Sequence, residues 1–314
     1  MAETRILVVG AGGFLGNHIC NHFSKRNYDI AVVGRNLTIE NLSQIKPRFS
    51  KCITLPDESF HSIVIDFQPN VIIYCAGSSP VQESFKFPYE DFQKSVLPCI
   101  FVLETIRKYA MDCSFIFLSS AAVYGNPTSV PIQEELPCLP ISPYGYHKKA
   151  SELIVDEYSS LYGVRACVLR IFSAYGEGLS RQVVHDLCKK ALDPSSSYLE
   201  VYGTGKESRD FIHASDVAQA IEFIILSKLP GTYNIGTGKQ TLVSDLANLV
   251  IRLTDSKKAV RFTKIARVGD PINWEADISR IKRLGFHPTI SLESGITKYV
   301  SWLSSTQPST YNNG

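Results

Sequence analysis

Three glycines follow the first apolar run of the chain at three-residue intervals, and they constrain its fold more than any other feature. The run 5–10, RILVVG, leads directly into Gly10, Gly13 and Gly16. A turn from a buried strand into a helix needs residues without Cβ, and a pyrophosphate needs close approach of the backbone at the helix N-terminus. The spacing therefore predicts a dinucleotide-binding loop. The cofactor-binding residues expected in this loop are Gly10, Gly13, Phe14, Leu15 and Gly16.

Short apolar runs alternate with longer helix-like segments over the first half of the chain. Runs rich in Val, Ile, Leu and Phe, with almost no polar alternation, are typical of strands buried on both faces of a parallel sheet. These runs are 5–10, 30–34, 71–77, 115–120 and 166–172, and the helix-like segments are 14–26, 88–110 and 144–162. The alternation predicts an α/β fold with a Rossmann-type doubly wound parallel sheet.

The pattern becomes less regular after residue 172. Strands are predicted at 198–203 and 231–236, and helices at 215–228, 243–253, 277–284 and 292–303. We expect residues 1–172 to form an NAD(P)-binding Rossmann domain, with segments near 205–236 returning to it. Residues 173–303 are expected to form mainly a smaller, partly interleaved α/β lobe that binds the substrate. The polar tail 304–314 lacks periodicity and is predicted to be disordered.

Charge and composition argue against several classes of function. A net charge of +2 gives no reason to expect a nucleic acid or a membrane surface as partner. No run of about 18 apolar residues occurs, and the N-terminal sequence MAETRILVVGAGG does not resemble a signal peptide. The eight cysteines include no C-x-x-C pair, which argues against a disulfide framework or a metal site. We therefore expect a cytoplasmic protein without a metal.

The end of the second predicted strand bears on the choice of cofactor. An acidic residue there bonds the ribose hydroxyls of NAD, whereas a basic residue suits the 2′-phosphate of NADP. Gly34 and Arg35 occupy this place, and the nearest acid, Asp29, precedes the strand. We therefore expect NADP, with NAD as the alternative. Further candidate cofactor-binding residues, at the end of the next long apolar run, are Ala76 and Gly77.

A tyrosine and a lysine, Tyr144 and Lys148, stand one helical turn apart in the stretch SPYGYHK. Ser119 and Ser120 end the run 115–120, so both are expected to face the ligand crevice. Beside a nicotinamide, Tyr144 would exchange a proton with the substrate, although a free phenol has a pKa of about 10. Lys148 would stabilise the phenolate, and Ser120 would hydrogen-bond the same substrate oxygen. Tyr144 and Lys148 are also expected to contact the cofactor.

Together these motifs resemble those of the extended short-chain dehydrogenases/reductases, in particular the nucleotide-sugar epimerase/dehydratase family. The resemblance runs from about residue 5 to residue 303. The three glycines match the family's G-x-x-G-x-x-G, Ser120 matches its catalytic Ser/Thr, and Tyr144 and Lys148 match its Y-x-x-x-K. The resemblance implies an NAD(P)-dependent enzyme that transfers hydride at the sugar of a nucleoside-diphosphate sugar. It also implies a homodimer in which helices near 88–110 and 144–162 pair.

The resemblance also implies a set of substrate contacts. Arg209, in SRDFIHASDVAQA, matches an arginine that approaches the substrate pyrophosphate, and Arg267, in ARVGDP, matches a second phosphate or ribose contact. Bidentate guanidinium pairing suits phosphate oxygens. Ser173 stands where the family often has an asparagine that contacts the substrate phosphate. The substrate-binding residues expected are Ser120, Ser173, Arg209 and Arg267.

The positions after Ser120 separate possible reactions. Dehydratases of the family carry an acidic pair there and decarboxylases a glutamate, whereas this chain has Ala121 and Ala122. Elimination and decarboxylation are therefore not expected. The preferred hypothesis is NADPH-dependent reduction of a nucleotide-linked 4-keto sugar, which Arg35 favours. The alternatives are an NAD-dependent nucleotide-sugar 4-epimerase, which SSAAVYG favours, and a non-catalytic NAD(P)- or sugar-nucleotide-binding protein.

Overall fold

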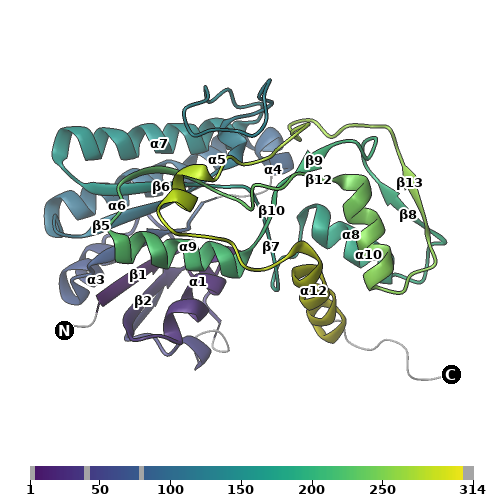
Figure 1. Cartoon of the computed structure of the whole chain (residues 1–314). Coiled ribbons are helices and arrows are strands. Elements are labelled where there is room, and N and C mark those ends of the chain that lie inside the picture. Colours follow the sequence, from purple (N-terminus) through teal and green to yellow (C-terminus); the bar gives the residue numbers. More distant parts are fainter. Residues whose placement is uncertain (1–3, 39–42, 78–80, 307–314) are drawn as a thin grey trace.

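The computed structural model describes residues 4–38, 43–77 and 81–306, and Figure 1 shows a large α/β part joined to a smaller lobe. One seven-stranded sheet in the order β11-β6-β5-β4-β1-β2-β3 forms the large part, and each neighbouring pair is parallel. Its strands are β1 (Thr4–Val9), β2 (Tyr28–Gly34), β3 (Phe49–Cys52), β4 (Val71–Tyr74), β5 (Ser114–Ser120), β6 (Arg165–Ile171) and β11 (Gly231–Ile235). The predicted Rossmann-type doubly wound sheet is confirmed.

The strand order reverses between β1 and β4, since β2 and β3 extend the sheet to one side of β1 and β4, β5 and β6 extend it to the other. At such a reversal the connections leave the sheet in opposite directions, which opens a crevice beyond the carboxyl ends of the strands. The predicted glycine loop follows β1 directly, so it lies at this switch point.

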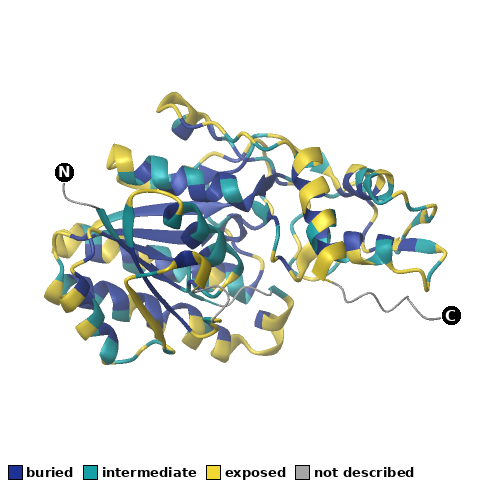
Figure 2. Cartoon of the chain, turned by 90° about the horizontal axis from the view of Figure 1, so that it is seen from below, coloured by how far each residue is buried: buried dark blue, intermediate teal, exposed yellow. Residues whose placement is uncertain are grey.

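Successive residues of β1 enter two separate cores on opposite faces of the sheet. Ile6 and Val8 belong to a core shared with helices α1 (Phe14–Ser24) and α9 (Ala214–Ser227). Leu7 and Val9 belong to a second core, shared with α3 (Ser59–Phe67), α6 (Leu97–Tyr109) and α7 (Pro143–Tyr162). Because both faces are covered, the strands of the sheet are mostly buried (Figure 2), and this accounts for their continuous apolar sequence.

The smaller lobe has its own core, to which Leu187, Leu199, Leu246 and Tyr299 contribute. Its elements are α8 (Gln182–Leu192), β8 (Tyr198–Val201), α10 (Val243–Leu253), β13 (Ala259–Phe262) and α12 (Leu292–Thr306), with β8 and β13 paired in parallel. Between the lobe and the large part lie two short strand pairs, β7 (Ser173–Tyr175) with β10 (Phe211–His213) and β9 (Ser208–Arg209) with β12 (Thr241–Leu242). The chain crosses between the two parts more than once, because α9 and β11 belong to the large part.

Several details differ from the sequence prediction, among them a break in one helix, a strand that was not predicted and the end of α12. The predicted helix 88–110 is two helices, α5 (Pro88–Ser95) and α6, because Pro98 in the first turn of α6 cannot donate a helical hydrogen bond. Strand β3 was not predicted, since its four residues are exposed and carry no apolar run. The tail predicted from 304 begins later: Ser305 and Thr306 still belong to α12, where their hydroxyls donate to the Trp302 carbonyl. Residues 307–314 lie outside the described part.

Polar side chains cover the outer edge of the sheet at β11. The Arg280 guanidinium, from α11 (Ser279–Arg283), donates to the Thr232 carbonyl at 2.9 Å. The Glu134 carboxylate accepts from the Asn234 backbone N–H at 2.9 Å. An edge strand with free backbone groups can pair with a second chain. These two side chains therefore protect the edge of the sheet. Arg280 joins β11 to α11, and Glu134 joins β11 to the loop before α7.

Asp210 organises the junction between the two parts, where it lies fully buried next to the predicted substrate residue Arg209. One carboxylate oxygen accepts from the Thr237 backbone and hydroxyl, each at 2.7 Å. The other accepts from the backbone N–H groups of Gly238 at 2.8 Å and Ala276 at 3.2 Å. Two separate segments of the chain, 237–238 and Ala276, thus depend on one carboxylate for their buried donors.

Replacing Asp210 with Asn is expected to lower the free energy of unfolding by about 3 kcal/mol, because an amide NH₂ then faces buried N–H donors. Urea denaturation followed by circular dichroism measures the change. The matched control is Asp66→Asn, an exposed aspartate on α3, whose free energy of unfolding should stay at the wild-type value. Equal stability of the two variants would show that Asp210 does not hold the junction.

Candidate active site

The glycine loop brings α1 against the end of β1 with almost no space for side chains. A Cβ on Gly16 would lie 2.2 Å from the Gly10 carbonyl oxygen, and a Cβ on Gly10 would lie 2.6 Å from the Ala76 nitrogen. Gly10 also has a φ of +91°, which favours glycine. Gly13 differs, because it is exposed and a Cβ there would meet only the Gly10 carbonyl, at 3.3 Å. Two of the glycines therefore serve packing, and Gly13 leaves backbone open to the cleft.

The N-terminus of α1 is suited to an anion. Gly13 is its N-cap, and no side chain caps the first turn. Backbone N–H groups at the start of a helix and the positive end of its dipole attract phosphate. The residues present at this loop fit the pyrophosphate of a dinucleotide.

One cleft of about 1070 Å³ extends from the carboxyl edge of the sheet to the smaller lobe. Every site residue that the sequence singled out lines it. They are Gly10, Gly13, Phe14, Leu15, Gly16, Arg35, Ala76, Gly77, Ser120, Tyr144, Lys148, Ser173, Arg209 and Arg267. The structure thus brings together loops from five strand ends and from both parts of the molecule.

Helix α7 positions the predicted catalytic pair. Ser142 caps its N-terminus, because the Ser142 hydroxyl accepts from the Gly145 backbone N–H at 3.1 Å. Pro143 occupies the first turn and Gly163 ends the helix with a φ of 74°. The Tyr144 backbone N–H donates to the Ser84 hydroxyl at 3.1 Å, so the first turn of α7 is also tied to α4 (Val81–Lys86). This turn is therefore fixed from two sides.

Lys148 is buried, although its side chain carries an amine. Its Nζ donates to the Leu118 carbonyl at 2.8 Å and lies 5.0 Å from the centre of the Phe117 ring. Burial lowers the pKa of Lys148, and the Cys99 and Cys75 thiols and the Glu152 and Asp91 carboxylates act against this shift. The amine is therefore held at a fixed place next to the end of β5.

The Tyr144 phenol lies close enough to the Ser120 hydroxyl for Ser120 to influence its ionisation. Burial raises the pKa of Tyr144, the interaction with Ser120 lowers it, and the nearby charges of Asp91 and Arg181 act in opposite directions. The Ser120 hydroxyl also accepts from the Ala122 backbone N–H at 3.2 Å. A phenol in this setting needs positive charge nearby to ionise, and the cleft offers Lys148 and Arg181.

Ser119 and Ser120 both line the cleft, as expected, but the Ser119 hydroxyl is engaged by a partner outside it. That hydroxyl donates to Glu152 of α7, while Ser120 reaches Tyr144. Neighbouring residues of a strand point to opposite sides, so only one of two consecutive serines can direct its hydroxyl at the substrate. Glu152 was not predicted, because its contact with Ser119 joins residues far apart in the sequence.

Arg35 lies at the end of β2, exposed and at the rim of the cleft. A Cβ on the preceding Gly34 would lie 3.2 Å from the Gly12 nitrogen, so close packing of the glycine loop explains the small residue there. Asp29, at the start of the same strand, pairs with Arg48 at 2.9 Å. Asp29, the acid nearest to Arg35 in sequence, therefore lies at the other end of β2 from Arg35 and is already paired with Arg48.

The two predicted substrate arginines come from the smaller lobe and its junction. Arg209 donates to the Ser208 carbonyl at 2.8 Å and lies 5.8 Å from the Trp274 ring. Arg267 stacks 4.0 Å from the Tyr202 ring and pairs with Asp186 at 3.5 Å. Arg209, Arg267 and Ser173 all line the cleft.

Gln182 and Trp274 also line the cleft, although neither was among the predicted site residues. Gln182 begins α8 with a φ of 70°, a strained conformation for a residue with a side chain. Trp274 donates through its indole N–H to the Gly125 carbonyl at 3.0 Å. Only the folded chain brings these residues beside Tyr144 and Arg209.

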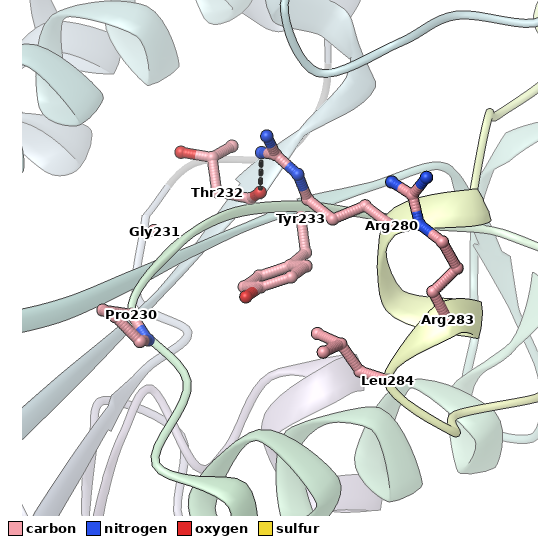
Figure 3. Close-up of a pocket in the computed structure, with 7 residues that line it drawn as sticks. All are labelled: Pro230, Gly231, Thr232, Tyr233, Arg280, Arg283 and Leu284. Atoms are coloured by element: carbon pink, nitrogen blue, oxygen red, sulfur yellow. Dashed lines mark hydrogen bonds between the residues drawn. The ribbon is translucent and has the colours of Figure 1, made fainter.

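A second hollow of about 450 Å³ lies at the outer edge of β11 (Figure 3). Tyr233 and Leu284 form its apolar side, and the guanidiniums of Arg280 and Arg283 project beside it. Arg280 is already paired with Glu135 at 2.5 Å. None of the residues predicted for catalysis or binding lines this hollow.

Residues 4–38, 43–77 and 81–306 contain neither a metal-binding cluster nor a membrane-spanning helix. No group of three or more His, Cys, Asp or Glu side chains there is arranged to hold a metal ion. No helix in the same ranges has both the length and the apolar character needed to cross a membrane. All eight cysteines are free thiols, and five of them are buried.

Comparison with known proteins places this geometry in a family. A family model described as "NAD dependent epimerase/dehydratase family" matches residues 6–236. The chain belongs to that family. The resemblance to extended short-chain dehydrogenases/reductases and the prediction of an NAD(P)-dependent enzyme are thereby confirmed.

Individual relatives extend over nearly the whole chain. A Methanocaldococcus jannaschii protein named "Putative UDP-glucose 4-epimerase" is 32% identical over 303 residues, which cover 95% of this chain and 98% of that protein. The structure of Thermus thermophilus UDP-glucose 4-epimerase in complex with NAD matches with a TM-score of 0.87 and 25% identity, covering 97% and 100% of the two chains. Thermotoga maritima UDP-glucose 4-epimerase with UDP-glucose also gives 0.87, at 26% identity, covering 96% and 99%.

The different packing of the glycines predicts different effects of the same substitution. Gly16→Ala should destabilise the fold by about 1–3 kcal/mol, since its Cβ would overlap the Gly10 carbonyl. Gly13→Ala should change stability by less than about 1 kcal/mol, yet weaken dinucleotide binding by about tenfold or more, because its Cβ faces the place of the pyrophosphate. Urea denaturation and NAD titration by calorimetry measure the two quantities. Wild-type affinity in Gly13→Ala would mean that the pyrophosphate lies elsewhere.

Proposed function

We propose that this chain is an NAD-dependent nucleotide-sugar 4-epimerase that acts on a UDP-linked hexose. The observation that carries the proposal is the convergence of Ser120, Tyr144 and Lys148 in one cleft, with alanines at the two positions after Ser120. Elimination of water needs a group that transfers a proton at the neighbouring carbon, and Ala121 and Ala122 offer none. The similarity to UDP-glucose 4-epimerase structures, one with NAD and one with UDP-glucose, supports this cofactor and this substrate class.

The three side chains suit reversible oxidation at the sugar C4. NAD, when bound, supplies the hydride acceptor for oxidation and the hydride donor for reduction. Tyr144 accepts the proton of the C4 hydroxyl during oxidation and returns a proton during reduction. The Ser120 hydroxyl, which lies close to Tyr144, donates to the same sugar oxygen. The Lys148 ammonium stabilises the phenolate form of Tyr144 between the two steps.

The cleft also contains groups that fit the rest of the substrate. Arg209 and Arg267 place two guanidiniums on the side of the smaller lobe, where they can pair with the oxygens of a diphosphate. Ser173 lines the same cleft. This arrangement leaves the sugar between the diphosphate and the Ser120–Tyr144 pair, as a C4 reaction requires.

An NADPH-dependent reductase of a nucleotide-linked 4-keto sugar is the second candidate. The sequence alone favoured it, because Arg35 suits the 2′-phosphate of NADP. The exposed position of Arg35 at the rim of the cleft is compatible with that role. The comparisons support the epimerase better, since the relatives and structures described above are named as UDP-glucose 4-epimerases.

Cofactor identity and turnover together distinguish the two candidates. The purified protein is denatured, the released nucleotide is identified, and the protein is then assayed with UDP-glucose and UDP-galactose. The proposal expects NAD, and interconversion of the two sugars without net consumption of cofactor. Strict preference for exchangeable NADPH, with one NADPH consumed per 4-keto sugar nucleotide reduced, would instead establish the reductase.

Tyr144→Phe is expected to lower kcat by about 100-fold or more, because the variant loses its proton-transferring hydroxyl. Tyr146→Phe provides the matched control, since this tyrosine lies on the same helix with its side chain 59% exposed. Rates are measured at saturating substrate, and circular dichroism verifies that both variants are folded. Turnover of Tyr144→Phe at the wild-type rate would refute the proposed chemistry.

We also propose that the protein is a homodimer formed through α6 and α7. These two adjacent helices leave Ile100, Leu153 and Leu161 exposed, the last at 71%. Phe92 and Tyr158, in contrast, pack within the chain, against His147 and Glu104 respectively. Exposed leucines on neighbouring helices are compatible with a helix-pairing interface.

The variant Leu153→Glu/Leu161→Glu should therefore be monomeric where the wild type is a dimer. Size-exclusion chromatography with light scattering measures the mass of both. The control is Leu226→Glu on α9, whose side chain is 68% exposed and lies on another face of the sheet. A monomeric wild type, or a dimer that survives the double substitution, would contradict this interface.

A further inference from the structure

Three polar side chains follow one another along a single face of α7. Tyr144, Lys148 and Glu152 are spaced four residues apart, so each lies one turn beyond the last. The first two reach the cleft, whereas Glu152 turns toward β5 and β6. Its side chain is only 10% exposed. A buried carboxylate one turn from the catalytic lysine has no role in the chemistry described so far.

Two donors hold the Glu152 carboxylate. Arg170, on β6, donates through Nε at 3.1 and 3.2 Å and through Nη2 at 2.8 Å. The Ser119 hydroxyl donates to Glu152 Oε1. Ser119 immediately precedes Ser120, so one end of this cluster is the strand residue next to a catalytic group.

Arg170 is fixed in turn by the surrounding strands and loops. Its Nη1 donates to the Tyr124 hydroxyl and to the Glu134 carbonyl, both at 2.9 Å. The Tyr124 hydroxyl donates to Asn234 Oδ1 on β11 at 2.8 Å. A chain of bonds therefore connects Glu152 to β11, the edge strand next to β6. Such a network leaves the carboxylate a single position.

The position of the Glu152 carboxylate matters because few other negative charges among the described residues lie near Lys148. Cys75, after β4, and Cys99, on α6, face the amine, but burial raises the pKa of each thiol to about 12, so both are neutral near pH 7. The remaining groups are the phenol of Tyr144 and two carboxylates, Asp91 on α5 and Glu152 on α7. Asp91 is already paired with His147 at 2.5 Å. Glu152 differs from Asp91 because it lies one turn from Lys148 on the same helix and pairs with a second cation, the buried Arg170, at 2.8 Å.

We propose that Glu152 is a positioning residue of the active site: held by Arg170 and Ser119, its carboxylate fixes the catalytic turn of α7 against the end of β5 and offsets the positive charge of Lys148 and Arg170. Glu152 does not touch substrate or cofactor in this scheme. It acts through Lys148, whose ammonium form stabilises the Tyr144 phenolate, and through Ser119, which aligns the neighbouring Ser120.

The sign of the expected effect follows from the charges. In Glu152→Gln the side chain keeps its size, but the negative charge that offsets the Lys148 and Arg170 cations is lost. Arg170 stays charged at all accessible pH values. Like charges disfavour ionisation, so Lys148 should lose its proton at a lower pH than in the wild type. Because turnover needs the ammonium form, the alkaline limb of the pH–rate profile should move to lower pH as well.

Competitive acetylation measures the pKa of Lys148 directly and needs no substrate. Trace acetic anhydride is reacted with the protein over a range of pH, and acetylation of Lys148 is quantified by peptide mass spectrometry. In Glu152→Gln the pKa of Lys148 should fall by about one unit. The matched control is Glu222→Gln, which removes a partly buried carboxylate that pairs with His22 at 2.7 Å and Arg26 at 3.0 Å, away from the cleft. This control should leave the titration of Lys148 unchanged.

The kinetic test rests on the proposed epimerase function. Glu152→Gln should show an alkaline limb of kcat about one pH unit lower, with KM for UDP-galactose within about twofold of the wild type. Ser119→Ala removes one donor to the same carboxylate. It should shift the pKa of Lys148 and the alkaline limb of kcat in the same direction as Glu152→Gln, but by less. This second variant carries the test if Glu152→Gln does not fold, since loss of one partner of a buried pair can be strongly destabilising.

The outcomes separate the two proposals. A wild-type titration of Lys148 in folded Glu152→Gln, or in Ser119→Ala if only that variant folds, would overturn the role of Glu152. A fall in melting temperature equal to that of Glu222→Gln, with a wild-type pH profile, would also overturn it, because the carboxylate would then be structural only. If the wild type does not interconvert the sugars, the proposed function fails, and the acetylation result alone decides the role of Glu152.

Discussion

The contact of α1 with the end of β1 is the constraint on which the rest of the structure depends. Gly16 lies against the Gly10 carbonyl, and Gly10 lies against the backbone of Ala76 after β4, so three elements meet where no side chain fits. This meeting point coincides with the reversal of strand order between β1 and β4. Because the backbones approach so closely, the first turn of α1 points its N–H groups along the carboxyl edge of the sheet. β5 and α7 contribute their polar residues to the same edge.

Burial of the Lys148 amine is the second constraint, and it explains why the polar network behind the cleft is so extensive. A buried ammonium is unfavourable unless fixed acceptors and anions surround it. The Leu118 carbonyl provides the direct acceptor, and Glu152 the negative charge one turn further along α7. The Glu152 carboxylate is itself largely buried, so Arg170 must neutralise it. Arg170 is held in turn by Tyr124, which bonds to the edge strand β11. The catalytic turn is therefore positioned by contacts that extend well beyond it.

The features predictable from the sequence are those whose residues are close together along the chain. The glycine loop, the spacing of Tyr144 and Lys148 and the apolar strands each show within a short window. The arrangement of Ser119 was not predictable, because its partner Glu152 lies on another element. Strand β3 was missed since only its pairing with β2, and no apolar pattern, makes it a strand. Gln182 and Trp274 reach the cleft through the folding of the smaller lobe, which no local pattern encodes.

The two arginines proposed to bind the substrate, Arg209 and Arg267, are held in different ways, and this bears on how specificity would arise. Arg209 precedes Asp210, whose buried carboxylate fixes the junction through the Thr237 and Gly238 backbones, so the place of Arg209 is set by the large sheet and the turn after β11. Arg267 instead contacts Tyr202 and Asp186, which both belong to the smaller lobe. The position of Arg209 is thus tied to the sheet that carries the Tyr144 site, whereas that of Arg267 is set by contacts within the smaller lobe. Changes in the lobe can therefore alter which nucleotide sugar fits without disturbing the catalytic residues, because those are anchored to the sheet.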